Sequence, residues 1–285
     1  MDLVLRRGKT EDAHACGAIC YSAFATVAER HGFPPDFPSA EVAADMLSGL
    51  LAHPGFYSVA AEQDGEIAGS NFLDERTPVA GVGPITVNPN VQNRQIGRAL
   101  MKAVLDRAEQ KGFAAVRLLQ ATYHTRSLSL YTKLGFESRE LLVVMQGDAL
   151  GLKKPGYLVR SATETDIGPC NQLCNRVHGH DRSGELVDAI GQGAATVVER
   201  DSRITGYSTG MAFFAHSVAE TNDDMKALIG AASEFQGPGF LVPTRNGELF
   251  RWCLDNGLRV VMPTTLMTMG LYNEPSGAYM PSILY

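Results

Sequence analysis

The stretch GPITVNPNVQNRQIGRALMKAVLDRAEQKG, residues 83–112, organises the first half of the chain. Its opening residues, 83–87, predict a strand, and residues 97–111 predict an amphipathic helix because Leu100, Val104 and Ala108 recur every four positions. A polar loop joins the two. Where a strand leads through a loop into a helix, several free backbone N–H groups and the positive helix end point at one place. Such a place can bind a phosphate without a cationic side chain.

Outward from this stretch, the sequence predicts a mixed sheet covered by helices. Asp64-Gly65 between two apolar runs is a strong hairpin signal. Strands followed by alternating strands and helices favour an α/β fold with a mixed (α+β) sheet. In the first half we expect strands at residues 3–7, 56–62, 66–72, 83–87, 115–119 and 137–145, and helices at residues 10–24, 39–51, 97–111 and 127–133.

The second half repeats this pattern. A period of 154 residues is too long for a solenoid, so it indicates two related domains in tandem. Gly, Lys and Pro cluster at residues 150–157, which predicts a first domain at 1–150 and a second at 156–285. In the second half we expect strands at 196–199, 204–214, 240–242 and 260–272, and helices at 223–235 and 247–255. The recurring residues are Arg6 as Arg160, Asp12 as Asp166, Cys16 as Cys170 and Cys20 as Cys174.

The composition excludes several classes of protein. The 285 residues are 45% hydrophobic and 20% charged, which is ordinary for a globular chain and argues against disorder. The net charge is -6, with 14 basic against 17 acidic residues up to position 150 and 11 against 14 beyond it. Neither half therefore offers a basic surface for nucleic acid. No apolar stretch is long enough to span a membrane, and the first residues do not form a signal peptide pattern.

The five cysteines fit reduced thiols in a cytoplasm better than a disulfide framework. Without a Cys-x-x-Cys spacing they do not indicate a metal site, and we expect small buried residues on helix faces. His178 and His180 stand in a polar stretch, where solvent-exposed side chains are expected rather than metal ligands. We therefore predict no bound metal.

Two motifs follow one another in the first half. The loop QNRQIG, residues 92–97, opens the helix, and LYTKLGF, residues 130–136, comes after one more strand. Over residues 1–147 the chain resembles the GCN5-related N-acetyltransferase (GNAT) family. That family has a loop of the form Gln/Arg-x-x-Gly-x-Gly/Ala at the first place and Leu-Tyr-x-x-x-Gly-Phe at the second. The resemblance implies two tandem acyl-CoA N-acyltransferase (GNAT) folds and acetyl-CoA as co-substrate.

By position, the resemblance assigns parts of the chain to acetyl-CoA. The loop amides and the start of the helix would hold the pyrophosphate, and the strand ending at Val87 would hydrogen-bond the pantetheine arm. The Val87 amide would face the thioester carbonyl, and the Tyr131 phenol would donate a proton to the leaving thiolate. The residues assigned to the cofactor are Ile85, Thr86, Val87, Gln92, Asn93, Arg94, Gln95, Ile96, Gly97, Arg98, Ala99, His124 and Ser127.

Three positions depart from the family pattern. Gln95 stands where the family has the first glycine of its loop, and His124 stands where an Asn often contacts CoA. The strand ending at Val87 carries no carboxylate, although several relatives place a general base there. Asp74 and Glu75, which we expect in a solvated turn, are weak substitutes. A water relay or an already neutral amine would also serve.

The second half departs further. Residues 215–224 contain three acids and no glycine, and carboxylates there would repel a pyrophosphate. We therefore expect the same fold with a degenerate cofactor site. Cys253 aligns with Tyr131, and core packing is favoured over a nucleophile because its sequence neighbours supply no activating base. The apolar tail, residues 271–285, should pack across the domain junction rather than extend into solvent.

The predicted function is transfer of an acetyl group from acetyl-CoA to a primary amine by direct attack, without a covalent enzyme intermediate. The alternatives are a non-catalytic acyl-CoA sensor or interaction protein, and a structural pair of domains without a ligand. The acceptor, a small molecule or a peptide amine, cannot be read from the sequence. The resemblance places its specificity in the loop at residues 31–38, in the last strands and in any second domain. We expect a cytoplasmic monomer or homodimer.

Overall fold

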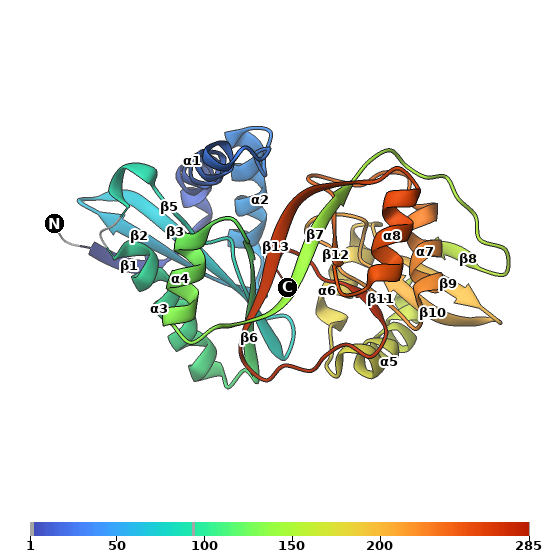
Figure 1. The fold of residues 1–285 in the computed structure, drawn as a ribbon. Helices are drawn as coiled ribbons and strands as arrows, with labels where there is room; N and C mark the ends of the chain where they lie inside the picture. The colour runs from blue at the N-terminus through green and yellow to red at the C-terminus, as the bar shows by residue number, and fades with distance from the viewer. Residues whose placement is uncertain (1–2, 93–94, 285) are drawn as a thin grey trace. The chain divides into compact units, whose positions relative to one another are not determined.

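The computed structural model describes residues 3–92 and 95–284, and the chain forms two compact units (Figure 1). The first unit contains the chain up to Leu118, residues 123–137 and Leu284. The second unit contains residues 119–122 and 138–283. The last strand of the first half thus belongs largely to the second unit. The division into sequence repeats at residues 150–156 stays a prediction.

The first unit is built on a mixed sheet. Neighbouring strands are antiparallel except for the fourth and sixth strands, which are parallel. The predicted α/β fold with a mixed sheet is therefore confirmed. In order across the sheet, the strands are β1 (Leu3–Arg7), β2 (Phe56–Gln63), β3 (Glu66–Asp74), β4 (Val79–Val82) and β6 (Ala115–Ala121).

The strand predicted at residues 83–87 is interrupted. β4 stops at Val82, and only Thr86 and Val87 form β5, which pairs with β3. Gly83 has a φ of 140°, and Pro84 has no N–H to donate to a ladder. Of the predicted residues only β5 is a strand, and β4, which was not predicted, also lies on β3 and pairs with β6.

Two helices cover each face of this sheet (Figure 1): α1 (Ala13–His31) and α2 (Ala40–Ala52) on one, α3 (Ile96–Lys111) and α4 (Thr125–Lys133) on the other. α1 extends beyond the predicted residues 10–24, because helix-compatible residues continue to Gly32, which ends the helix at a φ of 72°. α1 and α2 approach closely at Gly17, where a Cβ would lie 2.4 Å from the Ala44 Cα.

The second unit has helices on both faces of its own strands. One buried cluster gathers α5 (Ile167–His178) and α6 (Ser183–Gly191), and another gathers α7 (Asn222–Ala231) and α8 (Gly247–Asp255). One group of strands has the order β14 (Ala278–Met280), β11 (Ser217–Ala219), β10 (Arg203–Ser208), β9 (Thr196–Arg200) and β8 (Leu158–Ser161). The other has the order β13 (Arg259–Gly270), β7 (Glu137–Gln146) and β12 (Phe240–Pro243).

Several second-half predictions were too long or incomplete. β10 ends at Ser208, not at residue 214, because Thr209 and His216 bond each other across a turn. α7 ends at Ala231, not at residue 235, because Ala232 adopts an extended backbone. The elements α6, β11 and β14 were not predicted. β14 lies in the apolar tail, which is packed: it pairs with β11, and its three residues are buried.

The arginine and the aspartate that recur in the sequence form an ion pair in each unit. Arg6 holds both carboxylate oxygens of Asp12 at 2.7 and 2.8 Å, and Arg160 holds those of Asp166 at 2.7 and 2.9 Å. In each copy the carboxylate also accepts a backbone N–H three residues earlier, at 2.8 Å. Each pair thus fastens the first strand of a unit to the start of its first helix.

Burial decides three interpretations from the sequence. The five cysteines are free and buried, as predicted, and burial raises the pKa of Cys253 to about 12, which suits a core thiol. His178 and His180 are only 2% and 9% exposed, so the expectation of exposed histidines was wrong. The ring of His178 packs edge-on against Tyr279 at 5.0 Å.

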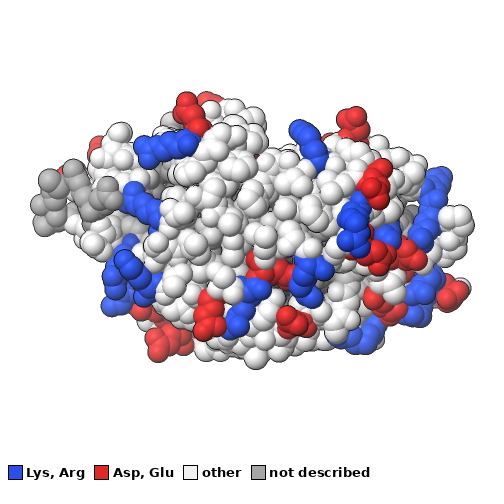
Figure 2. Space-filling model, in the orientation of Figure 1, with Lys and Arg blue, Asp and Glu red and all other residues white. Residues whose placement is uncertain are grey.

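Residues 3–92 and 95–284 contain no group of three or more side chains arranged to hold a metal ion. No helix in this part is long and apolar enough to cross a membrane. On the face in Figure 2, acidic and basic side chains are interspersed, in keeping with the small net charge of -6.

We expect Asp166→Asn to lower the free energy of unfolding of the second unit by about 1–3 kcal/mol at neutral pH, because a charged hydrogen-bond network is lost. Arg160 holds the pKa of Asp166 well below its usual range. The stabilisation is therefore complete above the unfolded pKa of about 4 and is lost as the pH falls below it. Urea unfolding at several pH values measures the difference. The exposed Glu164→Gln is the control, and equal effects of the two changes would contradict the assignment.

Candidate functional site

The start of α3 is an open helix end. Gln95 is its N-cap with a φ of 65°, no side chain caps the helix among the described residues, and its first turn has no acid. The first N–H groups of a helix lack partners within it, and they carry the positive end of its dipole. Arg98 in the first turn is exposed. This end can therefore accept a diphosphate.

Gln95 occupies the glycine position of the family loop in a left-handed backbone conformation. That conformation costs a residue with a side chain more than it costs glycine. The side chain of Gln95 is exposed. Gln95 therefore differs from the family pattern in residue type but has a left-handed backbone, the conformation that glycine adopts most readily.

Three elements meet at Gly97. A Cβ on Gly97 would lie 3.6 Å from the Val87 Cγ2 in β5 and 3.8 Å from the Leu130 Cδ2 in α4. The Gln92 side chain connects the same elements: its amide nitrogen donates to the Val87 carbonyl at 3.3 Å, and its oxygen accepts from the Arg126 guanidinium at 2.9 Å. Arg126, a cation that bonds Gln92 of the loop, was not among the predicted site residues.

The strand side of the site carries an unpartnered hydroxyl. The Thr86 Oγ1 in β5 is buried and has no hydrogen-bond partner among the described residues. Most buried polar groups have partners, so such a hydroxyl is suited to meet a ligand. Ile85, which was expected in the same strand, lies between β4 and β5 and is half-buried.

α4 contributes the last predicted residues. His124 is its N-cap, and burial together with the charges of Arg126 and His31 lowers the His124 pKa, so its ring is neutral at pH 7. The Ser127 hydroxyl donates to the His124 carbonyl at 2.9 Å. Tyr131 is 7% exposed, and burial raises its pKa far above the usual range, so the phenol keeps its proton.

The described residues among those predicted therefore come from β5 and the residue before it, from the following loop, from the start of α3 and from α4 with its N-cap. Asn93 and Arg94 lie outside the described residues. The two carboxylates named as substitute bases are engaged elsewhere, because Asp74 pairs with Arg76 at 2.5 Å and Glu75 pairs with Arg107 at 2.7 Å. Neither lies in the solvated turn that was expected.

The corresponding helix of the second unit, α7, has a closed end. The Thr221 hydroxyl accepts from the Asp224 N–H at 3.2 Å, and the Asp224 carboxylate accepts from the Thr221 N–H at 3.1 Å. Asp223 adds a second carboxylate to the first turn. A negatively charged, capped helix start is unsuited to a phosphate.

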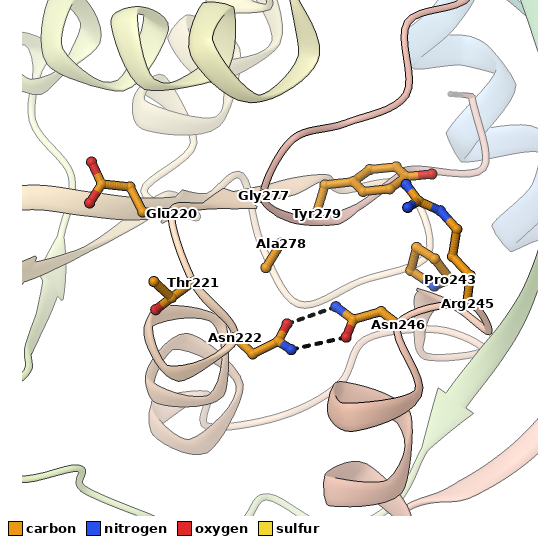
Figure 3. Close-up of a pocket in the computed structure, with 9 residues that line it drawn as sticks. All are labelled: Glu220, Thr221, Asn222, Pro243, Arg245, Asn246, Gly277, Ala278 and Tyr279. Atoms are coloured by element: carbon orange, nitrogen blue, oxygen red, sulfur yellow. Dashed lines mark hydrogen bonds between the residues drawn. The ribbon is translucent and has the colours of Figure 1, made fainter.

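The pocket beside α7 has a volume of about 340 Å³ (Figure 3). Asn222 and Asn246, at the starts of α7 and α8, close one side through paired amide bonds of 3.0 and 2.7 Å. Gly277 and the strand β14 form another side, next to β11. In the second unit β14 therefore pairs with β11. In the first unit β5 pairs with β3 alone among the described strands, so its other edge can accept a ligand.

Comparison with known proteins supports the fold of both halves. Residues 23–136 match the acetyltransferase (GNAT) family. A putative acetyltransferase from Pyrococcus horikoshii aligns with a TM-score of 0.75 and 16% identity, over 97% of this chain and 94% of its own. A tandem GNAT protein from the clavulanic acid biosynthesis pathway aligns with a TM-score of 0.55 and 13% identity, over 94% and 98%.

Similarity in sequence is more local. A mycothiol acetyltransferase from Nocardia farcinica is 36% identical over 63 residues, which is 22% of this chain. The match spans about a fifth of that relative, 21% of its length. The solved structures share a low identity and therefore establish the fold, which is the predicted tandem GNAT fold.

We expect Gly97→Asp to weaken CoA binding at least tenfold, because it places a carboxylate at the positive end of α3. Gly97→Ala is the matched control, since a Cβ there meets only ordinary contacts at 3.6 and 3.8 Å. Calorimetric titration with CoA measures both variants. Unchanged affinity in Gly97→Asp would mean that the diphosphate does not bind at this helix end.

Proposed function

We propose that the first unit transfers an acetyl group from acetyl-CoA to a primary amine, because residues 23–136 match the acetyltransferase (GNAT) family. Two features of the described residues carry this proposal: no side chain among them caps the start of α3, and none of them bonds the buried Thr86 hydroxyl. The helix end suits the diphosphate, and β5 suits the pantetheine arm.

Direct attack suits the residues of this site. The amine nitrogen attacks the thioester carbon, the carbonyl becomes an oxyanion, and a fixed N–H such as that of Val87 stabilises it. As the C–S bond breaks, the thiolate takes a proton from Tyr131, which burial keeps protonated. The cysteines of the chain are buried, so none is offered as a nucleophile for a covalent intermediate.

A second candidate is a non-catalytic acyl-CoA sensor. The left-handed Gln95 and the lack of a carboxylate in β5 favour it, because they leave binding in place but supply no base on that strand. Incubation with acetyl-CoA and a panel of amines, with detection of free thiol, separates the two functions. Thiol release with an amine supports the enzyme, and calorimetric CoA binding without release supports the sensor.

We expect Tyr131→Phe to lower the rate of thiol release by about 10²–10⁴ while CoA affinity changes little, because only the proton donor is removed. Tyr21→Phe, a half-buried tyrosine of α1, is the control and should keep the wild-type rate. A Tyr131→Phe enzyme as fast as the wild type would remove the phenol from the mechanism.

We expect one CoA to bind per chain. The second unit presents Asp223 and Asp224 at its corresponding helix end, and β14 lies against β11. A calorimetric titration gives the stoichiometry directly. In Gly97→Asp, binding should then disappear altogether, whereas a remaining site of undiminished affinity would assign cofactor binding to the second unit.

A further inference from the structure

The loop between α1 and α2 contains a carboxylate without a partner. Its sequence, HGFPPDFP at residues 31–38, holds one acid among aromatic residues and prolines. The Asp36 Oδ1 is buried and has no hydrogen-bond partner among the described residues. Leaving a buried carboxylate unpaired costs stability, and such groups gather at functional sites.

Aromatic rings surround this loop. Phe33 stacks on Tyr123 with ring centres 4.2 Å apart and planes 9° apart, and His31 lies 5.2 Å from the same ring. Phe37 packs against Phe24 of α1 at 6.2 Å. The loop therefore offers apolar ring faces beside a single negative charge.

Cys20 of α1 and Tyr123 lie close enough to Asp36 for its charge to act on them. Its charge contributes to raising the pKa of Cys20 in α1, and, after burial, to raising the pKa of Tyr123 to about 12. His31 and His124 lie beyond Tyr123. Burial alone raises the pKa of Asp36 to about 6, with no cation to offset it.

The loop that holds Asp36 contacts the segment that leads into α4. Phe33 of this loop stacks on Tyr123, and Tyr123 directly precedes His124. His124, Ser127 and Tyr131 are the residues in and beside α4 that are assigned to the cofactor and to proton donation. Asp36 therefore belongs to a loop that packs next to the residues of the candidate site.

We infer that Asp36 binds the ammonium group of the acceptor and removes its proton, and that the acceptor is a primary amine on an apolar, ring-sized substituent. This inference rests on the proposed function and supplies the general base that β5 lacks. The carboxylate provides the counter-charge for the ammonium, and the stacked pair of Phe33 and Tyr123 provides an apolar wall for the substituent.

The proton balance closes with the groups at hand. Asp36 takes one proton from the ammonium, and the free amine forms the N–C bond to the acetyl carbon. The C–S bond breaks with its electron pair on sulfur, which takes a proton from Tyr131. The amide nitrogen then loses its second proton to the phenolate, and Asp36 releases its proton to solvent. The net products are an acetamide, CoA thiol and one proton.

Two acceptors of the same size test the role of the base. Benzylamine is an ammonium ion at neutral pH, whereas phenylhydrazine is already uncharged. In Asp36→Asn we expect kcat/KM for benzylamine to fall by about 10²–10³ and that for phenylhydrazine by less than about tenfold. The exposed Asp45→Asn on α2, with the same change of charge, should match the wild type for both.

The pH profile gives a second readout. We expect kcat/KM of the wild type with benzylamine to rise through about pH 6 and this limb to be absent in Asp36→Asn. Equal losses with the two acceptors would reduce Asp36 to a structural role, and no loss would remove it from the site. Wild-type protein that binds acetyl-CoA but acetylates neither compound overturns this inference alone. Failure to bind acetyl-CoA overturns the proposed function itself.

The pH dependence of the melting temperature distinguishes a carboxylate that serves the reaction from one that stabilises the fold. A carboxyl whose folded pKa lies above its unfolded pKa favours the folded state less as the pH rises from about 4 through about 6. Asp36→Asn should therefore melt a few degrees higher than the wild type at pH 8 and match it at pH 4. A lower melting temperature at pH 8 would show that the carboxylate supports the fold and would overturn the inference.

Discussion

Each unit depends on an arginine–aspartate ion pair that fastens its first strand to its first helix. In both copies the aspartate receives two guanidinium bonds and a backbone N–H, and the arginine reaches a glutamate on the neighbouring strand, Glu62 or Glu199. Such bidentate, charge-assisted bonds are directional as well as strong. The position of the first helix on the sheet follows from this pair, and so does the position of the loop that leaves the helix.

The two units differ at the starts of the corresponding helices α3 and α7, which follow the central strands. In the first unit α3 starts at a left-handed residue without an acid in its first turn, so its N–H groups face outward. In the second unit the start of α7 is capped, because the Thr221 hydroxyl accepts from the Asp224 N–H and the Asp224 carboxylate accepts from the Thr221 N–H. The same secondary structure therefore gives an anion site in one copy and a closed end in the other. The difference lies in a few side chains and not in the fold.

Local patterns predicted the parts of the structure that local physics controls. The helix at residues 247–255 and the strand at residues 3–7 were predicted to the residue, and the helix start is fixed locally by the Asn246 side chain, which accepts from the Leu249 N–H. β14 could not be predicted, because three residues of the tail become a strand only by pairing with β11, about 60 positions earlier. The buried state of His178 depends in the same way on the distant Tyr279.

The candidate site shows the same division between local and distant causes. The loop and the α4 motif were visible in sequence because their spacing is fixed within one segment. Arg126 and Asp36 were not, since their significance comes from what lies opposite them in space: Gln92 for the first, and a set of rings for the second. The carboxylates that stood out by position, Asp74 and Glu75, are held by arginines. Asp36 stands out because its Oδ1 has no hydrogen-bond partner among the described residues, and a sequence does not show which side chains lack partners. Burial of this oxygen without a partner among the described residues is expected to cost stability, and in the proposed reaction the ammonium of the acceptor supplies that partner.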